Sequence, residues 1–181
     1  MSRHPRYLFG ASLALSFVLL TACRPAMGGA RRATARLTDA SGREVGTLTL
    51  RDAPGQPVTV EGELQGLPAG THGIHFHGVG QCDGAGAFAS AGAHFNPASR
   101  KHGLESAEGP HAGDLPNVVA GADGRAVVRL TTPRVALGGE SGSLLDADGS
   151  ALVVHAAPDD QRTDPSGNSG ARIACGVVAP R

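Results

Sequence analysis

The sequence has few aromatic residues and almost no lysine. Its 181 residues include no tryptophan, one tyrosine and five phenylalanines, and Lys101 is the only lysine. Basic and acidic residues are balanced at 16 each, so no polycationic face is available and nucleic acid is not expected as a partner. We find no internal repeat and no convincing helix. The 27 glycines and 12 prolines favour one loop-rich β domain.

The N-terminal segment has the organisation of a secretory signal. Arg3 and Arg6 precede an apolar run at 7–20, which is shorter than the ~20 residues needed to span a bilayer. The tetrapeptide Leu-Thr-Ala-Cys at 20–23 resembles a bacterial lipobox, in which the cysteine becomes the lipid-modified first residue of the mature protein.

We therefore expect a lipoprotein signal peptide at 1–22, a lipidated Cys23 with a short tether at 23–32, and one domain at 33–181. This organisation predicts a membrane-anchored lipoprotein outside the cytoplasm, in the periplasm or cell envelope. Ordinary signal cleavage before Ala30 is the alternative.

Cysteine use agrees with export. Once Cys23 is assigned to the anchor, Cys82 and Cys175 remain, and two cysteines in an exported domain commonly pair. Such a bridge would close a loop of roughly ninety residues and stabilise the fold by about 4–5 kcal/mol in the chain-entropy model. Two buried free thiols are the alternative.

Short strands separated by turns account for most of the chain. Alternating apolar positions and turn residues predict strands at 33–39, 45–50, 58–64, 71–78, 117–120, 126–131, 151–155 and 172–178. This pattern favours an all-β antiparallel sandwich or barrel. Residues 79–112 have no regular period, and so long an ordered loop in a compact domain is usually functional.

Histidines are concentrated between residues 73 and 114. A single histidine in a strand is usually packed or solvated, but His75 and His77 lie on one face of a strand, and more follow at His94, His102, His111 and His155, with Asp114 nearby. Neutral imidazole binds zinc and copper, and zinc also accepts a carboxylate. Six imidazoles exceed one four-coordinate site, so we expect two metals, either separate or sharing a ligand.

Ligand chemistry suggests how the two sites divide. Imidazole-only coordination suits copper(II) and could be formed by one loop histidine with the three strand histidines His75, His77 and His155. A zinc tetrahedron could be formed by one further histidine with His102, His111 and Asp114. His94 is then left to serve both metals, which requires an imidazolate with both ring nitrogens deprotonated.

These segments closely resemble copper/zinc superoxide dismutases of the bacterial, lipoprotein type. The resemblance covers nearly all of 33–181 and rests on G-I-H-F-H (73–77), H-F-N-P (94–97), R-K-H (100–102), H-x-G-D-L (111–115), L-V-V-H (152–155) and G-A-R-I-A-C-G (170–176). It implies an eight-stranded antiparallel Greek-key β-sandwich or barrel with long metal-binding loops. It also implies an enzyme that converts superoxide to oxygen and hydrogen peroxide.

The resemblance further implies a role for each site residue. Copper would be held by His75, His77, His94 and His155, and zinc by His94, His102, His111 and Asp114. His94 would bridge the metals, leave copper on its reduction and carry a proton. Arg172 would hold the substrate anion, Asp159 would link a copper histidine to a zinc histidine, and the cysteines would form the Cys82–Cys175 disulfide.

Some features depart from the family or stay unassigned. Ala156 and Ala157 follow His155 where many relatives carry charge, and the loop before Arg172 is short, with Arg162 its only other cation. We therefore expect weaker electrostatic steering of the substrate than in strongly steered relatives. His72 is expected to be structural. A homodimer is one option, but the sequence identifies no interface.

Two rival functions remain open at this point. One is an extracytoplasmic copper-binding or copper-delivery protein on the same fold, without turnover. The other is a structural adhesion sandwich, in which the histidines would have no reason to converge.

Overall fold

The computed structural model describes residue 1 and residues 29–139 and 142–181. This part of the chain forms β-strands and one 3₁₀ turn, η1 (Ala89–Ala91), so the all-β prediction is confirmed. The strands are β1 (Arg31–Thr38), β2 (Glu44–Asp52), β3 (Val58–Leu64), β4 (Gly70–His72), β5 (Ile74–His77), β6 (Val118–Ala120), β7 (Ala126–Thr132), β8 (Ala151–His155) and β9 (Arg172–Pro180). Apart from residue 1, the predicted signal peptide at 1–22 lies outside the described residues, and so does Cys23. The predicted tether at 23–32 is too long at its end, because β1 already begins at Arg31.

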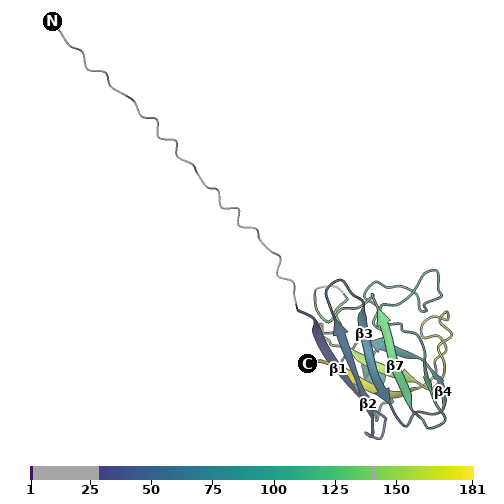
Figure 1. Cartoon of the computed structure of the whole chain (residues 1–181). Helices are drawn as coiled ribbons and strands as arrows, with labels where there is room; N and C mark the ends of the chain where they lie inside the picture. The colour runs from purple at the N-terminus through teal and green to yellow at the C-terminus, as the bar shows by residue number, and fades with distance from the viewer. Residues whose placement is uncertain (2–28, 140–141) are drawn as a thin grey trace.

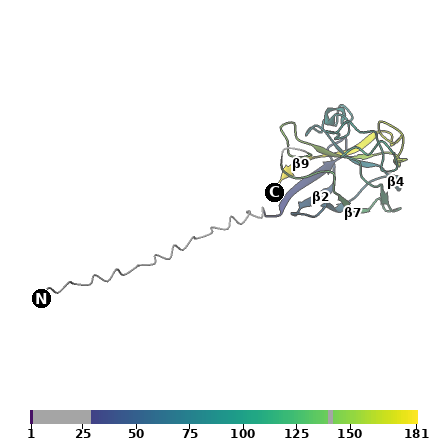
Figure 2. The same cartoon turned by 90° about the horizontal axis from the view of Figure 1, so that it is seen from above.

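Seven strands form one antiparallel sheet in the order β5-β8-β9-β1-β2-β3-β7, and β4 pairs with β6. Neighbours such as β9 and β1 are far apart in sequence, which is the crossover pattern of a Greek key. Figure 1 shows β1, β2, β3 and β7 side by side, and Figure 2 shows β9 on the opposite side from β2 and β7. The expected antiparallel Greek-key architecture is confirmed.

Alternating apolar residues of the strands fill the space inside this curved sheet. Ala33 and Leu37 of β1, Leu48 and Leu50 of β2 and Phe76 of β5 are fully buried. Burying a leucine side chain of this kind contributes about 1.5–3 kcal/mol. Among the described residues, all members of this core cluster lie between positions 33 and 178, so this part of the chain contains a hydrophobic core of its own.

One predicted strand, 71–78, is divided at Gly73. β4 pairs with β6, whereas β5 pairs with β8, so the chain changes sheets at this glycine. A Cβ at position 73 would lie 3.0 Å from Ser169 Cβ, 3.2 Å from His75 Cε1 and 3.3 Å from Asp159 Cβ. Only glycine fits comfortably at this corner, which packs directly against the histidine cluster described below.

Cys82 and Cys175 form a disulfide, as predicted. Their Cα atoms are 5.6 Å apart, and the bridge spans 93 positions of sequence. It attaches the loop that follows β5 to the middle of β9. Within residues 29–139 and 142–181, no helix has the length and apolar character needed to cross a membrane.

Candidate metal centre

The predicted ligands, distant in sequence, converge in the fold. His75 and His77 lie on β5, His155 ends β8, and the long loop between β5 and β6 supplies the rest. Each is at most 8% exposed. They form two groups, in each of which the candidate ligand atoms all lie within 4.8 Å of one another: His75, His77, His94 and His155, and then His94, His102, His111 and Asp114. His94 belongs to both groups.

The long loop reaches this position because it covers the free edge of β5. Its backbone forms isolated bridges to that strand, pairing His75 with Asp114 and His77 with His94. The amide of Phe76 donates to the carbonyl of Gly113 at 2.9 Å, and a side chain at Gly113 would collide with the Phe76 carbonyl. The loop therefore supplies hydrogen-bond partners for the backbone of the edge strand β5. It also brings the ligands that the loop carries next to those of the strand.

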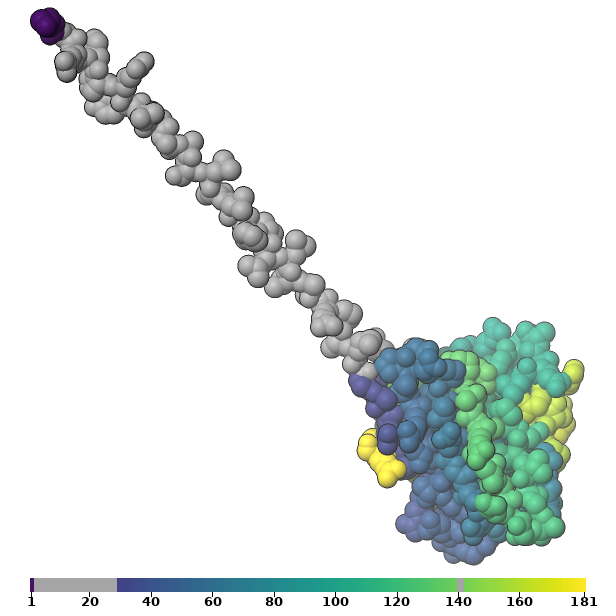
Figure 3. All heavy atoms as spheres, in the orientation of Figure 1, coloured from purple at the N-terminus to yellow at the C-terminus, as the bar shows by residue number. Residues whose placement is uncertain are grey.

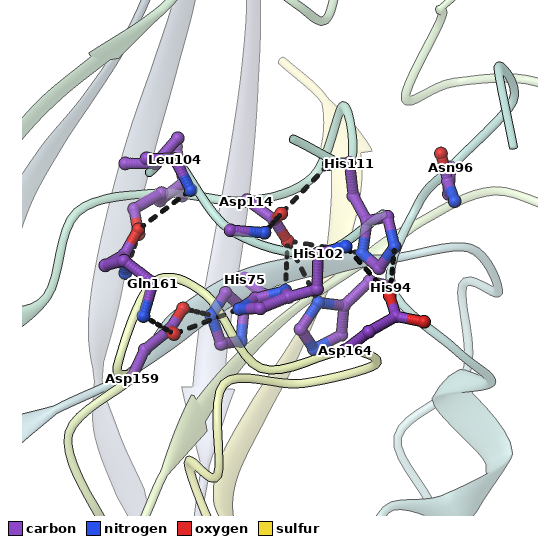
Figure 4. A network of polar contacts seen from close by, with 12 residues as sticks. His75, His94, Asn96, His102, Leu104, His111, Asp114, Asp159, Gln161 and Asp164 are labelled. Atoms are coloured by element: carbon purple, nitrogen blue, oxygen red, sulfur yellow. Dashed lines mark hydrogen bonds and ion pairs between the residues drawn. The ribbon is translucent and has the colours of Figure 1, made fainter. Parts of the chain in front are cut away.

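In the second group, three histidines surround Asp114 at spacings that fit a zinc site (Figure 4). The Nδ1 atoms of His94, His102 and His111 lie 3.0, 3.1 and 3.4 Å from Oδ1 of Asp114. Metal–ligand bonds of about 2.0–2.1 Å place neighbouring ligands of a tetrahedron about 3.3 Å apart. The other carboxylate oxygen, Oδ2, accepts the backbone N–H of Gly103 and of His111, each at 2.9 Å. Oδ1 therefore remains available to bind a metal ion together with the three histidines.

Charge is concentrated in this group. Burial alone would raise the pKa of Asp114, but hydrogen bonds with His102, His111 and His94 hold it well below its ordinary value. Burial likewise opposes protonation of His102, yet hydrogen bonds and charges of Asp114 and Asp159 raise its pKa to about 9. Without a metal, the carboxylates therefore retain a proton on His102 that a divalent cation would replace.

In the first group, one nitrogen of each strand histidine is held by the protein. Nδ1 of His77 lies 2.9 Å from the Gly92 carbonyl, and Nδ1 of His155 lies 3.2 Å from the Gly170 carbonyl. Because a carbonyl accepts only from N–H, the Nε2 atoms of these rings keep their lone pairs; they lie 3.4 Å apart. Two further nitrogens, Nδ1 of His75 and Nε2 of His94, are buried without a hydrogen-bond partner. The group thus offers four nitrogen ligands.

Three of these rings, those of His77, His94 and His155, are neutral at ordinary pH. Burial, followed by the neighbouring imidazoles, lowers the pKa of His77 to about 2 and of His155 to about 3. Burial also lowers the pKa of His94 to about 4, although Asp114 acts in the opposite direction. Ligands of copper must be unprotonated, so the fold prepares these imidazoles for that role. Together, the orphaned nitrogens and the all-imidazole donor set fit copper.

Asp159 lies between the two groups. Its Oδ2 is 2.7 Å from Nε2 of His75 and its Oδ1 is 2.9 Å from Nε2 of His102, with all three side chains buried. Carboxylates in this position orient ligating imidazoles and fix their tautomers. The carboxylate itself is placed by Gln161, whose backbone N–H donates to Oδ1 at 2.6 Å.

Arg172 lies at the start of β9, at the edge of the first group. Its guanidinium donates to the carbonyls of Phe88 and Gly92, each at 2.6 Å. The Gly92 carbonyl also accepts from His77, so one backbone group positions both side chains. Small residues line a hollow beside the guanidinium, namely Gly86, Ala87, Ala89, Gly92, Ala93, Gly170 and Ala171. A small anion entering there would meet one cation, Arg172.

A family model for copper/zinc superoxide dismutase matches residues 44–178, three quarters of the chain. The chain belongs to the copper/zinc superoxide dismutase family. A copper/zinc superoxide dismutase of Caulobacter vibrioides is 47% identical over 149 residues, covering 81% of this chain and 84% of the relative. One of Aquifex aeolicus is 42% identical over 149 residues, covering 81% and 86%. A SOD-like protein from Bacillus subtilis has a TM-score of 0.76 at 38% identity, covering 80% of this chain and 96% of that structure.

Several residues that support this superoxide dismutase site were not identified from the sequence. The side-chain amide of Asn117 donates to the backbone carbonyl of Asp159 at 2.8 Å and accepts its N–H at 2.9 Å. Asp164 accepts the backbone N–H of His102 at 2.8 Å, and Arg134 donates to the carbonyl of Asp114 at 2.7 Å. None of these residues has a spacing or a residue type that marks it in the sequence.

His72 lies outside both groups. It is buried, with Nδ1 2.8 Å from the carbonyl of His155 and Nε2 2.8 Å from the carbonyl of Pro68. Its contacts are with backbone, which agrees with the expectation of a structural role. In the copper/zinc superoxide dismutase domain it fixes the end of β8, from which the His155 ring projects.

Proposed function

We propose that this protein catalyses the dismutation of superoxide to oxygen and hydrogen peroxide, using a copper ion and a zinc ion. Copper is assigned to His75, His77, His94 and His155, and zinc to His94, His102, His111 and Asp114. The observation that carries the proposal is the position of His94. Its Nδ1 faces Asp114 in one group, while its Nε2 is buried without a partner beside the other.

Membership of the family does not by itself establish that a chain is active, so the activity depends on the residues of the site. The relatives of this chain include proteins called copper/zinc superoxide dismutase and others called only superoxide dismutase-like. Here both ligand groups are complete, and a cationic side chain is fixed beside one of them. A copper-delivery protein needs neither the second ligand group nor Arg172, so that alternative is not favoured.

The reaction balances over two superoxide anions. One loses an electron and leaves as oxygen; the other gains that electron with two protons and leaves as hydrogen peroxide. Copper, when bound, supplies a centre that accepts and returns one electron. The protein must therefore bind a small anion, hold a proton nearby and keep the ligand geometry fixed.

Arg172 binds and orients the anion. Two of its N–H groups are engaged by backbone carbonyls, so the guanidinium is fixed and its remaining donors are available to an anion. A cation that is already fixed in place stabilises a bound anion without reorganisation during the reaction. Burial behind the small residues of the hollow strengthens that attraction.

His94 is the side chain placed to hold a proton between the two halves of the reaction. Its Nδ1 is engaged in the zinc group, and its Nε2 is the atom that faces the copper group. A proton on Nε2 would lie on the side of the ring that faces the copper group. Asp114, with its strongly lowered pKa, keeps the Nδ1 side of this ring facing a negative charge.

We also propose that the domain works outside the cytoplasm, attached to a membrane through a lipid on Cys23. The Cys82–Cys175 disulfide supports export, because such bridges persist in oxidising compartments. The lipobox-like tetrapeptide at 20–23 supports the anchor. Metabolic labelling with a palmitate analogue tests it: label that disappears in Cys23→Ser supports the anchor, and an unlabelled wild type excludes it.

Metal analysis combined with a superoxide-removal assay tests the enzymatic proposal. We expect one copper and one zinc per chain and catalytic removal of superoxide. His155→Ala should abolish turnover, whereas Arg172→Ala should retain both metals and lower the rate about 10- to 100-fold. A wild type that binds both metals but does not remove superoxide would support the copper-holding alternative. A wild type that binds neither would exclude both.

A further inference from the structure

Three arginines form one row across neighbouring strands at the end of the sheet where the domain begins. Arg32 of β1 is paired directly with Arg51 of β2. The backbone N–H of Arg181, which follows β9, donates to the carbonyl of Arg32 at 3.0 Å. All three are exposed.

Strand alternation places the three side chains on the outer face. Ala33 and Leu50, next to Arg32 and Arg51, are fully buried, so these arginines point away from the core. Arg181 lies just beyond β9, where Pro180 pairs with Ala33, so Arg181 continues that register beside Arg32 and is also exposed. The guanidinium groups therefore share one face and one row.

This arrangement is unfavourable for the isolated domain. Side chains directly opposite on antiparallel strands have Cβ atoms about 4.5–5.5 Å apart, and like charges there are destabilising. Among the described residues, none of the three forms an ion pair with a carboxylate. Arg36, further along β1, pairs with Glu44 at 3.0 Å. Arg36 is therefore neutralised within the sheet, whereas the charges of the three arginines in the row could be neutralised by an anion from outside the domain.

The position of the arginine row indicates which kind of anion it would bind. β1 begins at Arg31, eight positions after Cys23, so an extended connection reaches at most about 29 Å. A second copy of the chain is a poor occupant, because a symmetric interface would place the row against itself. We propose that this row docks on the anionic phospholipid headgroups of the membrane that carries the anchor. The inference rests on the proposed membrane attachment and is independent of the metal chemistry.

Docking at this end would orient the site. Arg181 and Arg172 lie at opposite ends of β9, which spans Arg172–Pro180 and has a length of about 30 Å. Figures 1 and 3 show the end of the chain beside the start of β1, while the yellow-green loop before Arg172 lies on the other side of the domain. The hollow beside Arg172 would then face away from the bilayer, open to diffusing superoxide.

Vesicle partitioning tests the inference without the anchor. The experiment uses residues 24–181, the predicted mature chain without its lipid-modified cysteine, loaded with copper and zinc. At low salt we expect binding to vesicles containing phosphatidylglycerol and little binding to pure phosphatidylcholine. The triple variant R32Q/R51Q/R181Q should bind about 100-fold more weakly, which corresponds to about 1 kcal/mol per arginine. Added salt should weaken wild-type binding.

The matched control is R36Q/R125Q/R129Q, which removes the same charge from elsewhere on the sheet. It should retain most of the binding, and both triple variants should dismute superoxide as the wild type does. Equal losses in the two variants, or no preference for anionic vesicles, would overturn the inference. Loss of dismutation in the wild type would count only against the proposed enzyme, and an unlabelled Cys23 only against the anchor. Relief of repulsion should also make R32Q/R51Q/R181Q at least as stable as the wild type.

Discussion

The Nε2 atom of His75 lies 2.7 Å from Oδ2 of Asp159, and both side chains are buried. The other oxygen of that carboxylate reaches His102, so one residue orients a ring in each ligand group. Asp159→Asn keeps the shape but removes one acceptor and the negative charge. We expect copper and zinc affinities to fall about 10- to 100-fold. Competition titrations with chelators measure this, and unchanged affinities for both ions would contradict the proposed role.

Asn117 positions Asp159 through two hydrogen bonds to its backbone. Asn117→Ala leaves a half-buried peptide group unpaired, and we expect it to cost about 1–3 kcal/mol in the free energy of unfolding. Zinc should also dissociate faster than from the wild type. Gln65→Ala is the control, because its side-chain amide donates only to Glu63 on the exposed surface. Equal effects of the two substitutions on zinc release would show that Asn117 is not a positioning residue.

Zinc affinity should depend on pH through His102. Its pKa is raised to about 9 in the metal-free domain, so below that pH zinc must displace a proton. Apparent affinity should therefore rise about tenfold per pH unit between pH 7 and 9 and then level off. The copper-side rings with lowered pKa values are already neutral in this range and have no second proton to release. Calorimetric titration in buffers of different ionisation enthalpy measures the released protons, and zinc binding without proton release would contradict the prediction.

The stability of the metal-free domain should pass through a maximum with pH. The raised pKa of His102 contributes stability below the unfolded value of 6.5, and this contribution is lost as pH rises through about 9. The lowered pKa values of His77, His94 and His155 act in the opposite direction, because the unfolded state gains their protons as pH falls below 6.5. Urea unfolding of the metal-free domain from pH 5 to 9 should show losses on both sides. A steady rise through pH 9 would contradict the charge on His102.

The disulfide should affect both stability and substrate binding. It spans 93 positions, for which the chain-entropy model gives about 4–5 kcal/mol. Cys82→Ser with Cys175→Ser should lower the free energy of unfolding by about that amount. It should also reduce the rate, because the loop after Cys82 carries the carbonyls of Phe88 and Gly92 that fix Arg172. A variant that loses stability but keeps the full rate would show that Arg172 is held without the bridge.

The rate should depend only weakly on ionic strength. Small uncharged residues surround Arg172 in the hollow, and the residues after His155 are Ala156 and Ala157. Electrostatic steering requires an extended field, which a single cation beside the site provides only in part. Rates measured over a range of salt concentrations decide this. A steep fall of the rate with added salt would contradict this prediction and show that further charges steer the substrate. The variant R32Q/R51Q/R181Q would then test whether the arginine row supplies them.

The strands were predictable because their apolar residues alternate, and each boundary falls within about two residues of the structure. The presence of two histidine groups was also accessible, since the type and number of ligands indicated two metals, either separate or sharing a ligand, and left His94 to serve both. Which strands pair with one another could not be predicted from the sequence. The change of sheets at Gly73 depends on contacts with Ser169 and Asp159, which are far away in sequence.

The supporting shell of the site was equally inaccessible to sequence reasoning. Asn117 acts through the backbone of Asp159, 42 positions away, and any polar residue at the start of a strand would have looked the same. The arginine row arises only when β2, β1 and the end of β9 are placed side by side. Charges that are unremarkable along the chain become informative once strand register is known.

The central claim is that the His94 ring spans two metal positions. Electron paramagnetic resonance of the domain loaded with copper(II) in both positions tests it most directly, because an imidazolate couples the spins of the ions that it joins. We predict that the signals of the two ions are coupled in the wild type and uncoupled in His94→Ala. Two independent copper signals of full intensity in the wild type would contradict the claim.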